Sequence, residues 1–130
     1  MESQLIFSYD YACYQIHKIE GVRFAGIINN RGRKIAGGFR HDILPLEKDE
    51  KKLEMLFMEL SLDLSMRQEF NESLGEIKGI VSYRDKVNII TIPFGKNFVL
   101  LSTEQIEPIN IIQKTKEILE GMDSPRVSAC

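Results

Sequence analysis

Cysteine is scarce and tryptophan is absent in this chain of 130 residues, and neither sign of charge dominates. Cys13 and Cys130 are the only thiols, which are too few for a disulfide framework or a thiolate metal site. The formal net charge is -2 at pH 7, whereas a nucleic-acid binder usually carries a basic stripe. We therefore expect a protein of the reducing cytoplasm that does not bind nucleic acid.

Long apolar runs are also missing, so we expect no membrane span and no membrane partner. The first residues, Met1 to Gln4, show no basic stretch followed by an apolar one, which a secretory signal would need. A chain of this length fits one hydrophobic core. The sequence predicts a single domain over residues 1–122 and a loose tail over residues 123–130, which includes Cys130.

Motifs for catalysis and cofactor binding are missing as well. Neither GxGxxG nor GxxxxGK[ST] occurs. His17 is expected at the surface or half-buried, and Cys13 in the core. His41 and Asp42 are adjacent, so their side chains would rarely meet, and no motif places a nucleophile beside them. No ligand set converges on a metal. We expect no enzymatic activity, no catalytic residues, no metal and no cofactor.

Hydrophobic periodicity divides the chain into helices and strands. Three- and four-residue steps between apolar residues predict helices over 9–20 and from 107 to about Gly121, with a longer one over 48–70. Residue types typical of strands, separated by short turns, cover 22–29, 34–39, 74–83, 86–93 and 97–103. This order predicts an α+β domain, α-β-β-α-β-β-β-α, with a five-stranded antiparallel sheet flanked by helices.

The segment from residue 21 to residue 40 is rich in glycine and arginine, and it predicts a hairpin. Gly32 lies in "NNRGR", where a tight turn needs a positive φ, and Asn29 and Asn30 also tolerate that conformation. Gly26, Gly37 and Gly38 lie inside the predicted strands, where glycine indicates a bulge or the close approach of another backbone.

Basic side chains gather on this hairpin: Arg23, Arg31, Arg33, Lys34 and Arg40. If Arg23 and Arg33 lie on the same face of the sheet, these residues could contact an anion or an acidic partner surface. The alternative interpretation is that they are solvated residues at strand ends beside a turn.

The longest predicted helix, 48–70, carries apolar residues on two opposite sides. A rotation of 100° per residue gives an inner stripe of Leu53, Leu56, Phe57, Leu60 and Leu64, and an outer stripe of Met55, Met58, Leu62 and Met66. A helix on the surface of a monomer needs only one apolar face, so the outer stripe requires a partner. Its spacing is close to the seam of paired helices, and methionine suits an adaptable interface.

The order of elements and the first hairpin, "VRFAGIINNRGRKIAGG", resemble the roadblock/LC7 family, whose domains share a profilin- and longin-like architecture. The segments "RFAGIINNRGRKIAGGFR" and "LPLEKDEKKLEMLFMELSL" are also similar to small uncharacterised archaeal proteins. The resemblance covers residues 9–120. It implies a homodimer in which edge strands join and the long helices lie side by side. The implied interface residues are Met55, Met58, Leu62 and Met66 on the helix and Ile77, Ile80 and Val81 on the strand over 74–83.

Function is implied by the same resemblance. It indicates a non-enzymatic interaction module, a scaffold or small regulatory subunit, with a small GTPase or a larger complex as partner. The alternative is a sensing domain of the PAS, GAF or longin-like kind, which would hold a small molecule between the sheet and a helix. Such a domain would show an apolar pocket with a few convergent polar groups.

Overall fold

The computed structural model describes residues 2–123. Its helices are α1 (Glu2–His17), α2 (Glu50–Gln68), α3 (Asn71–Leu74) and α4 (Pro108–Asp123), and its strands are β1 (Val22–Ile28), β2 (Lys34–Phe39), β3 (Ile80–Tyr83), β4 (Asn88–Phe94) and β5 (Asn97–Thr103). The strands form one sheet in the order β2-β1-β5-β4-β3, and every neighbouring pair is antiparallel. This confirms the predicted α+β fold with a five-stranded antiparallel sheet.

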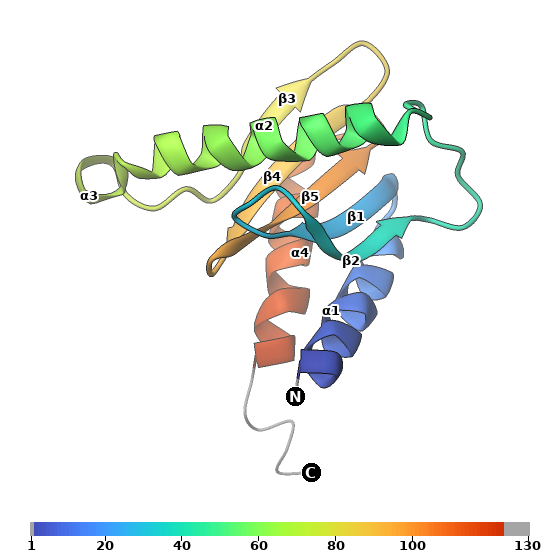
Figure 1. The fold of residues 1–130 in the computed structure, drawn as a ribbon, viewed down its shortest axis with the longest axis horizontal. Coiled ribbons are helices and arrows are strands. Elements are labelled where there is room, and N and C mark those ends of the chain that lie inside the picture. Colours follow the sequence, from blue (N-terminus) through green and yellow to red (C-terminus); the bar gives the residue numbers. More distant parts are fainter. Residues whose placement is uncertain (1, 124–130) are drawn as a thin grey trace.

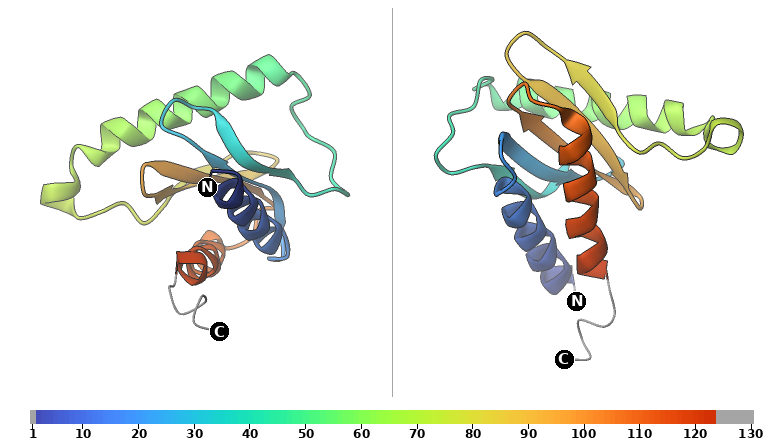
Figure 2. Two further views of the ribbon diagram at one scale, coloured as in Figure 1. Left: turned by 60° about the horizontal axis from the view of Figure 1, so that its bottom comes forward. Right: turned by 180° about the vertical axis from the view of Figure 1, so that it is seen from behind.

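Helices cover both faces of the sheet, which gives three layers (Figures 1 and 2). α1 and α4 lie on one face, and α2 crosses the other. Each face has its own core: Ile16, Val99 and Ile111 belong to the first, and Phe57 and Leu100 to the second. Because the central strands are covered from both sides, β1 and β5 consist of nearly continuous apolar residues. Among the described helices, none is both long and apolar enough to cross a membrane.

The flanking helices confirm that helices lie at these two places in the chain, but their ends differ from the prediction. Cys13 and Ile16 are buried on α1, and Ile111 and Leu119 are buried on α4. α1 begins seven residues before the predicted start, and α4 continues past Gly121 to Asp123. Apart from the adjoining residues and backbone of α4 itself, no atom of the described residues lies within 4 Å of the place where a Cβ would stand on Gly121. At so exposed a position a helix can tolerate glycine at a cost of about 1 kcal/mol, so Gly121 does not end it.

The predicted strand over 74–83 is wrong in its first half. Residues 71–74 form α3, which closes with a hydrogen bond from the Gly75 N–H to the Asn71 carbonyl (N···O 2.8 Å), and Gly75 has a φ of +90°. Only Ile80–Tyr83 pairs with β4, where Ile80 lies opposite Thr91. Continuing that register would bring Lys78 opposite Pro93, which has no N–H to donate to the ladder.

Glycine at two points of the β1–β2 hairpin is required by backbone geometry. Gly32 has a φ of +79°, as predicted, whereas neither Asn29 nor Asn30 adopts a positive φ. Asn29 instead stabilises the turn through its side-chain Oδ1, which accepts from the N–H groups of Arg31 and Arg33 (N···O 2.9 and 3.0 Å). Gly37 has a φ of +83°, and a Cβ there would lie 2.1 Å from the carbonyl oxygen of Ala25.

The two neighbouring glycines of β2 make a matched test of this geometry. We expect Gly37→Ala to lower the free energy of unfolding by about 2–4 kcal/mol, because the new methyl group collides with backbone at a strained φ. Gly38→Ala should change it by less than about 1 kcal/mol, since the nearest atom, Lys34 Nζ, would be 3.8 Å away. Urea denaturation measures both, and equal effects would contradict this account.

Candidate interaction surface

The outer stripe of α2 is exposed. Met55, Met58, Leu62 and Met66 have exposed fractions of 58–63%. On the opposite side of the same helix, Phe57 and Leu64 are buried against the sheet. The helix starts where the Asp49 side chain accepts a hydrogen bond from the Lys51 N–H (N···O 2.9 Å). The sequence therefore correctly predicted two faces, and the sheet of the same chain covers only one.

The turn of the β1–β2 hairpin fixes the position of α2. Gly32 is buried, and a Cβ at that position would lie 2.6 Å from the Cα of Met58. The turn therefore touches the backbone of α2 near its middle. In the sheet, β1 and β2 lie at one side and β3 at the other, so the hairpin turn and β3 flank α2 from opposite sides (Figure 1).

β3 is an end strand of the sheet, so within residues 2–123 no other strand pairs with its outer edge. A groove of about 630 Å³ lies beside the C-terminal half of α2, and Met66, Ile77 and Ile80 all line it. Three of the predicted interface residues are therefore brought together. Val81 lies elsewhere: its side chain packs against the core on the α1 and α4 face, so it could join an interface only through its backbone.

β2, the strand at the other end of the sheet, has several of its backbone groups occupied by side chains. The N–H of Gly37 donates to Asp10 Oδ1, and the carbonyl of Gly37 accepts from Lys34 Nζ (both 2.8 Å). The carbonyl of Gly38 accepts from His17 Nε2 at 2.8 Å. Strand addition needs free N–H and C=O groups, so these contacts protect the β2 edge. Of the two end strands, β3 is the more available for pairing.

The contact between Asp10 and Gly37 can be tested directly. We expect Asp10→Ala to lower the free energy of unfolding by about 1–2 kcal/mol, because a charge-assisted hydrogen bond to the backbone is lost. Asp10→Asn is the matched control, since its amide oxygen still accepts from the Gly37 N–H. Urea denaturation compares them, and an Asn variant as unstable as the Ala variant would count against this role.

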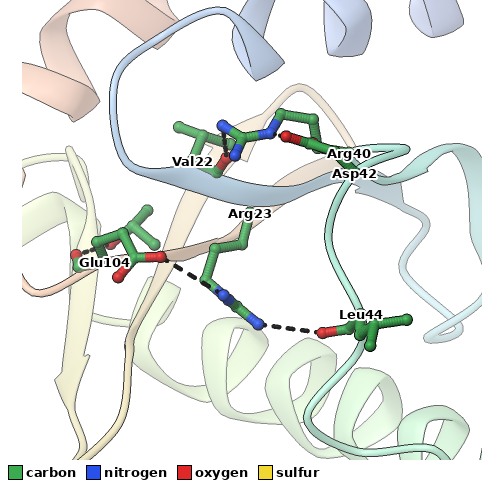
Figure 3. Close-up of polar contacts among 7 residues, drawn as sticks. Val22, Arg23, Arg40, Asp42, Leu44 and Glu104 are labelled. Atoms are coloured by element: carbon green, nitrogen blue, oxygen red, sulfur yellow. Dashed lines mark hydrogen bonds and ion pairs between the residues drawn. The ribbon is translucent and has the colours of Figure 1, made fainter.

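The basic residues of the hairpin do not form one site. Arg23 and Arg40 lie at the base of the hairpin, and their guanidinium groups are already engaged (Figure 3). Arg23 contacts Glu104 (3.4 Å) and the Leu44 carbonyl (3.2 Å), and Arg40 donates to the Val22 carbonyl (3.2 Å) and to Asp42 (2.6 Å).

Arg31 and Arg33 lie at the far end of the hairpin, beside the turn, and both are exposed. Lys34 already donates to the Gly37 carbonyl. A contact with an anion or an acidic partner therefore stays a prediction, with Arg31 and Arg33 as the more accessible pair.

The candidate nucleophile Cys13 and the candidate pair His41–Asp42 lie in environments that do not favour catalysis. Burial raises the pKa of the Cys13 thiol to about 12, so little nucleophilic thiolate forms near pH 7. The hydrogen bond from Arg40 lowers the pKa of the Asp42 carboxyl. The partner of this carboxylate is therefore Arg40. Within residues 2–123, no three His, Cys, Asp or Glu side chains are grouped so that they could hold a metal ion.

Several exposed apolar residues near this surface were not predicted. They lie beyond the two ends of the outer stripe: Leu46 on the N-terminal side, and Phe70 and Leu74 on the C-terminal side. Tyr83, at the end of β3, is also exposed and lines a second groove of about 1120 Å³ beside the N-terminal half of α2. Phe70 falls at the end of the predicted helix, so the sequence carries a signal for it, whereas the sequence pattern predicts Leu74 in a strand.

Solved structures share this fold at low sequence identity. The gliding protein MglB from Thermus thermophilus superposes with a TM-score of 0.72 at 13% identity, covering 90% of this chain and 87% of that one. A roadblock/LC7 domain from Streptomyces avermitilis gives a TM-score of 0.65 at 8% identity, with coverages of 86% and 92%. MglC from Myxococcus xanthus gives 0.58 at 12%, with coverages of 88% and 96%. The chain therefore has a roadblock/LC7 fold.

Sequence comparison is more specific about the family and silent about activity. No curated protein matches the sequence. One family model matches residues 1–124, nearly the full length, and its description is a family of unknown function, DUF6659. The chain belongs to the DUF6659 family.

Proposed function

We propose that the chain is a non-enzymatic, homodimeric interaction module that serves as a scaffold or small regulatory subunit. The observation that carries this proposal is the exposed outer stripe of α2 beside the outer edge of β3. The roadblock/LC7 fold supports it, because one solved structure of that fold is described as MglB with a tetrameric arrangement.

The outer stripe can supply only part of the free energy of association. Full burial of an apolar side chain of this size is worth about 1.5–3 kcal/mol, and these four side chains are a little under two-thirds exposed. Covering them in both copies would therefore give about 7–14 kcal/mol. Association costs about 4–15 kcal/mol, so the helices alone would give a marginal dimer. Pairing between the two β3 edges would make the dimer stable.

Both surfaces are compatible with one two-fold axis. Asp63 and Ile80 both line the groove beside the C-terminal half of α2, and Leu60 and Ser82 both line the groove beside its N-terminal half. The middle of α2 thus lies level with the middle of β3. A two-fold axis at that level would place the two helices antiparallel and pair the two β3 strands. The same surface of both copies would then form the interface.

We propose a further partner, besides the second copy of the chain, from the family resemblance, which implies a small GTPase or a larger complex. Arg31 and Arg33 are the proposed contacts with an acidic surface of that partner, since they lie at the hairpin turn against α2. A sensing domain is the second candidate. It is favoured by the groove of about 1120 Å³ between α2 and the sheet, lined by Phe24, Leu53 and Leu100 among others.

Met58→Glu tests the proposed dimer. We expect the wild-type chain to be dimeric at micromolar concentration, and the variant to be monomeric, because a carboxylate would be buried at the centre of the contact. Size-exclusion chromatography with light scattering measures the mass. Native mass spectrometry of the same samples would detect a retained small molecule, which would favour the sensing domain.

Ile109→Glu is the matched control, since Ile109 is equally exposed but lies on α4, on the opposite face of the sheet. It should leave the dimer intact. Met58 is exposed in the single chain, but its Cγ lies beside Gly32 of the hairpin turn. The urea midpoint of the monomeric variant is therefore compared with that of the wild-type chain, which separates the loss of the dimer from the loss of this contact. A wild-type chain that is monomeric at micromolar concentration would rule out the proposal, as would a Met58→Glu variant that still forms the same dimer.

A further inference from the structure

We infer that opposite charges at the two ends of α2 set the antiparallel register of the dimer, with Lys51 of each copy beside Glu69 of the second copy. This inference rests on the proposed homodimer and deepens it by specifying its register. The occupant of the surface is a second copy of this chain, because the charges at the two ends of the stripe complement each other.

Lys51 and Glu69 both belong to the line of the outer stripe. Lys51 precedes Met58 by about two helical turns, and Glu69 follows Leu62 by about two. Glu69 keeps a right-handed helical backbone (φ -61°, ψ -18°), so it continues the path of α2. Both side chains are exposed, and neither forms an ion pair with another residue of the described range 2–123. Along this line, the stripe is apolar in its middle, with a basic residue at its start and an acidic residue at its end. Lys52, Glu59 and Asp63 lie beside it, in the grooves towards β3.

The two orientations of a helix pair differ sharply in energy for such a stripe. In a parallel pair, Lys51 would face Lys51 of the second copy, and Glu69 would face Glu69. In an antiparallel pair centred near Leu60, Lys51 would face Glu69 at both ends, while Met58 would face Leu62. Like charges at the rim of an interface repel wrong arrangements, whereas opposite charges fix the register. The charges therefore favour the antiparallel pair.

Residues beyond the ends of α2 repeat the same order of charges in the sequence. Lys48 and Glu72 are equally far along the chain from Leu60, and both are exposed. Leu46 and Leu74 are also equally far from it, with exposed fractions of 55% and 81%. Lys48 and Leu46 lie before α2, and Glu72 and Leu74 lie in α3. Antiparallel pairing would bring these further opposite charges and apolar side chains to the same end of the dimer.

A groove is available for the apolar end of the partner. The groove of about 1120 Å³ lies beside the N-terminal half of α2, and Leu46, Met55 and Tyr83 line it. Phe70 and Leu74 project beyond the other end of α2, next to the short helix α3. In the antiparallel dimer, Phe70 and Leu74 of one copy would cover the groove of the other. Each copy contributes both parts, as a two-fold symmetric interface requires.

The ion pairs are expected to govern specificity more than affinity. An exposed pair contributes only about 0.2–1 kcal/mol, but reversing the charges turns attraction into repulsion at both ends of the dimer. Salt screens exposed charges over about 3 Å at 1 M ionic strength, compared with about 10 Å at 0.1 M. The register effect should therefore fade at high salt, while the contribution of the apolar stripe should persist.

A charge exchange between two variants tests the register. The first variant is Lys48→Glu with Lys51→Glu, and the second is Glu69→Lys with Glu72→Lys. In about 0.1 M salt we expect the dissociation constant of each homodimer to rise about tenfold or more. An equimolar mixture should form a heterodimer with nearly wild-type affinity, because opposite charges meet again at both ends. Native mass spectrometry of differently tagged chains measures the ratio of heterodimer to homodimers.

The dipole of α2 favours the new charges at Lys51 and Glu69, whereas Glu72→Lys places a base in the first turn of α3. Urea denaturation of each variant therefore accompanies the test, and only variants that unfold at the wild-type midpoint are compared. Lys96→Glu with Lys114→Glu is the control for net charge, since both residues are exposed and lie away from α2. It should leave the wild-type dissociation constant unchanged. A monomeric wild-type chain would overturn both the dimer and its register. A dimeric wild-type chain whose two variants also dimerise normally, and mix statistically, would overturn the register alone.

Discussion

The structure depends on one geometric constraint: α2 has two apolar faces, and the sheet beneath it can cover only one. Phe57 and Leu64 fill the space above β1 and β5, which leaves Met58 and Leu62 exposed, with the β1–β2 turn beside Met58. The β1–β2 turn holds the helix in this position, because Gly32 allows its backbone to touch Met58. The helix therefore cannot roll to hide the second face without losing both the core and the turn.

The two end strands of the sheet differ in how many of their outer backbone groups are occupied. This difference agrees with the position of the exposed outer stripe of α2. Asp10, Lys34 and His17 occupy backbone groups of β2, on the side of the sheet away from β3. β3 is short, and the segment before it does not extend the ladder, because Pro93 cannot support a longer one. The exposed stripe and the available strand edge thus lie on the same side of the molecule, which would let one partner cover both.

The sequence predicted the features that arise from local pattern. Periodicity identified both faces of α2, and the glycine of "NNRGR" identified the hairpin turn, because each depends on nearby residues alone. The sequence prediction failed where residues far apart in the chain determine the structure. The strand before Ile80 is shorter than predicted because its register would reach Pro93 of β4. Arg23 is held away from the arginines of the turn by its contacts with Glu104 and Leu44. The sequence shows the charges of Lys51 and Glu69. Their proposed role in setting the register of the dimer follows only from their exposure at the two ends of the outer stripe.

Methionine oxidation tests most directly whether the outer stripe is covered in solution. Hydrogen peroxide converts exposed methionine to the sulfoxide, and peptide mapping reports each residue separately. We predict that Met55, Met58 and Met66 are protected at concentrations where the dimer forms and become oxidised on dilution, all three over the same concentration range. Rapid oxidation of all three at every concentration, in a chain that remains folded, would contradict the account.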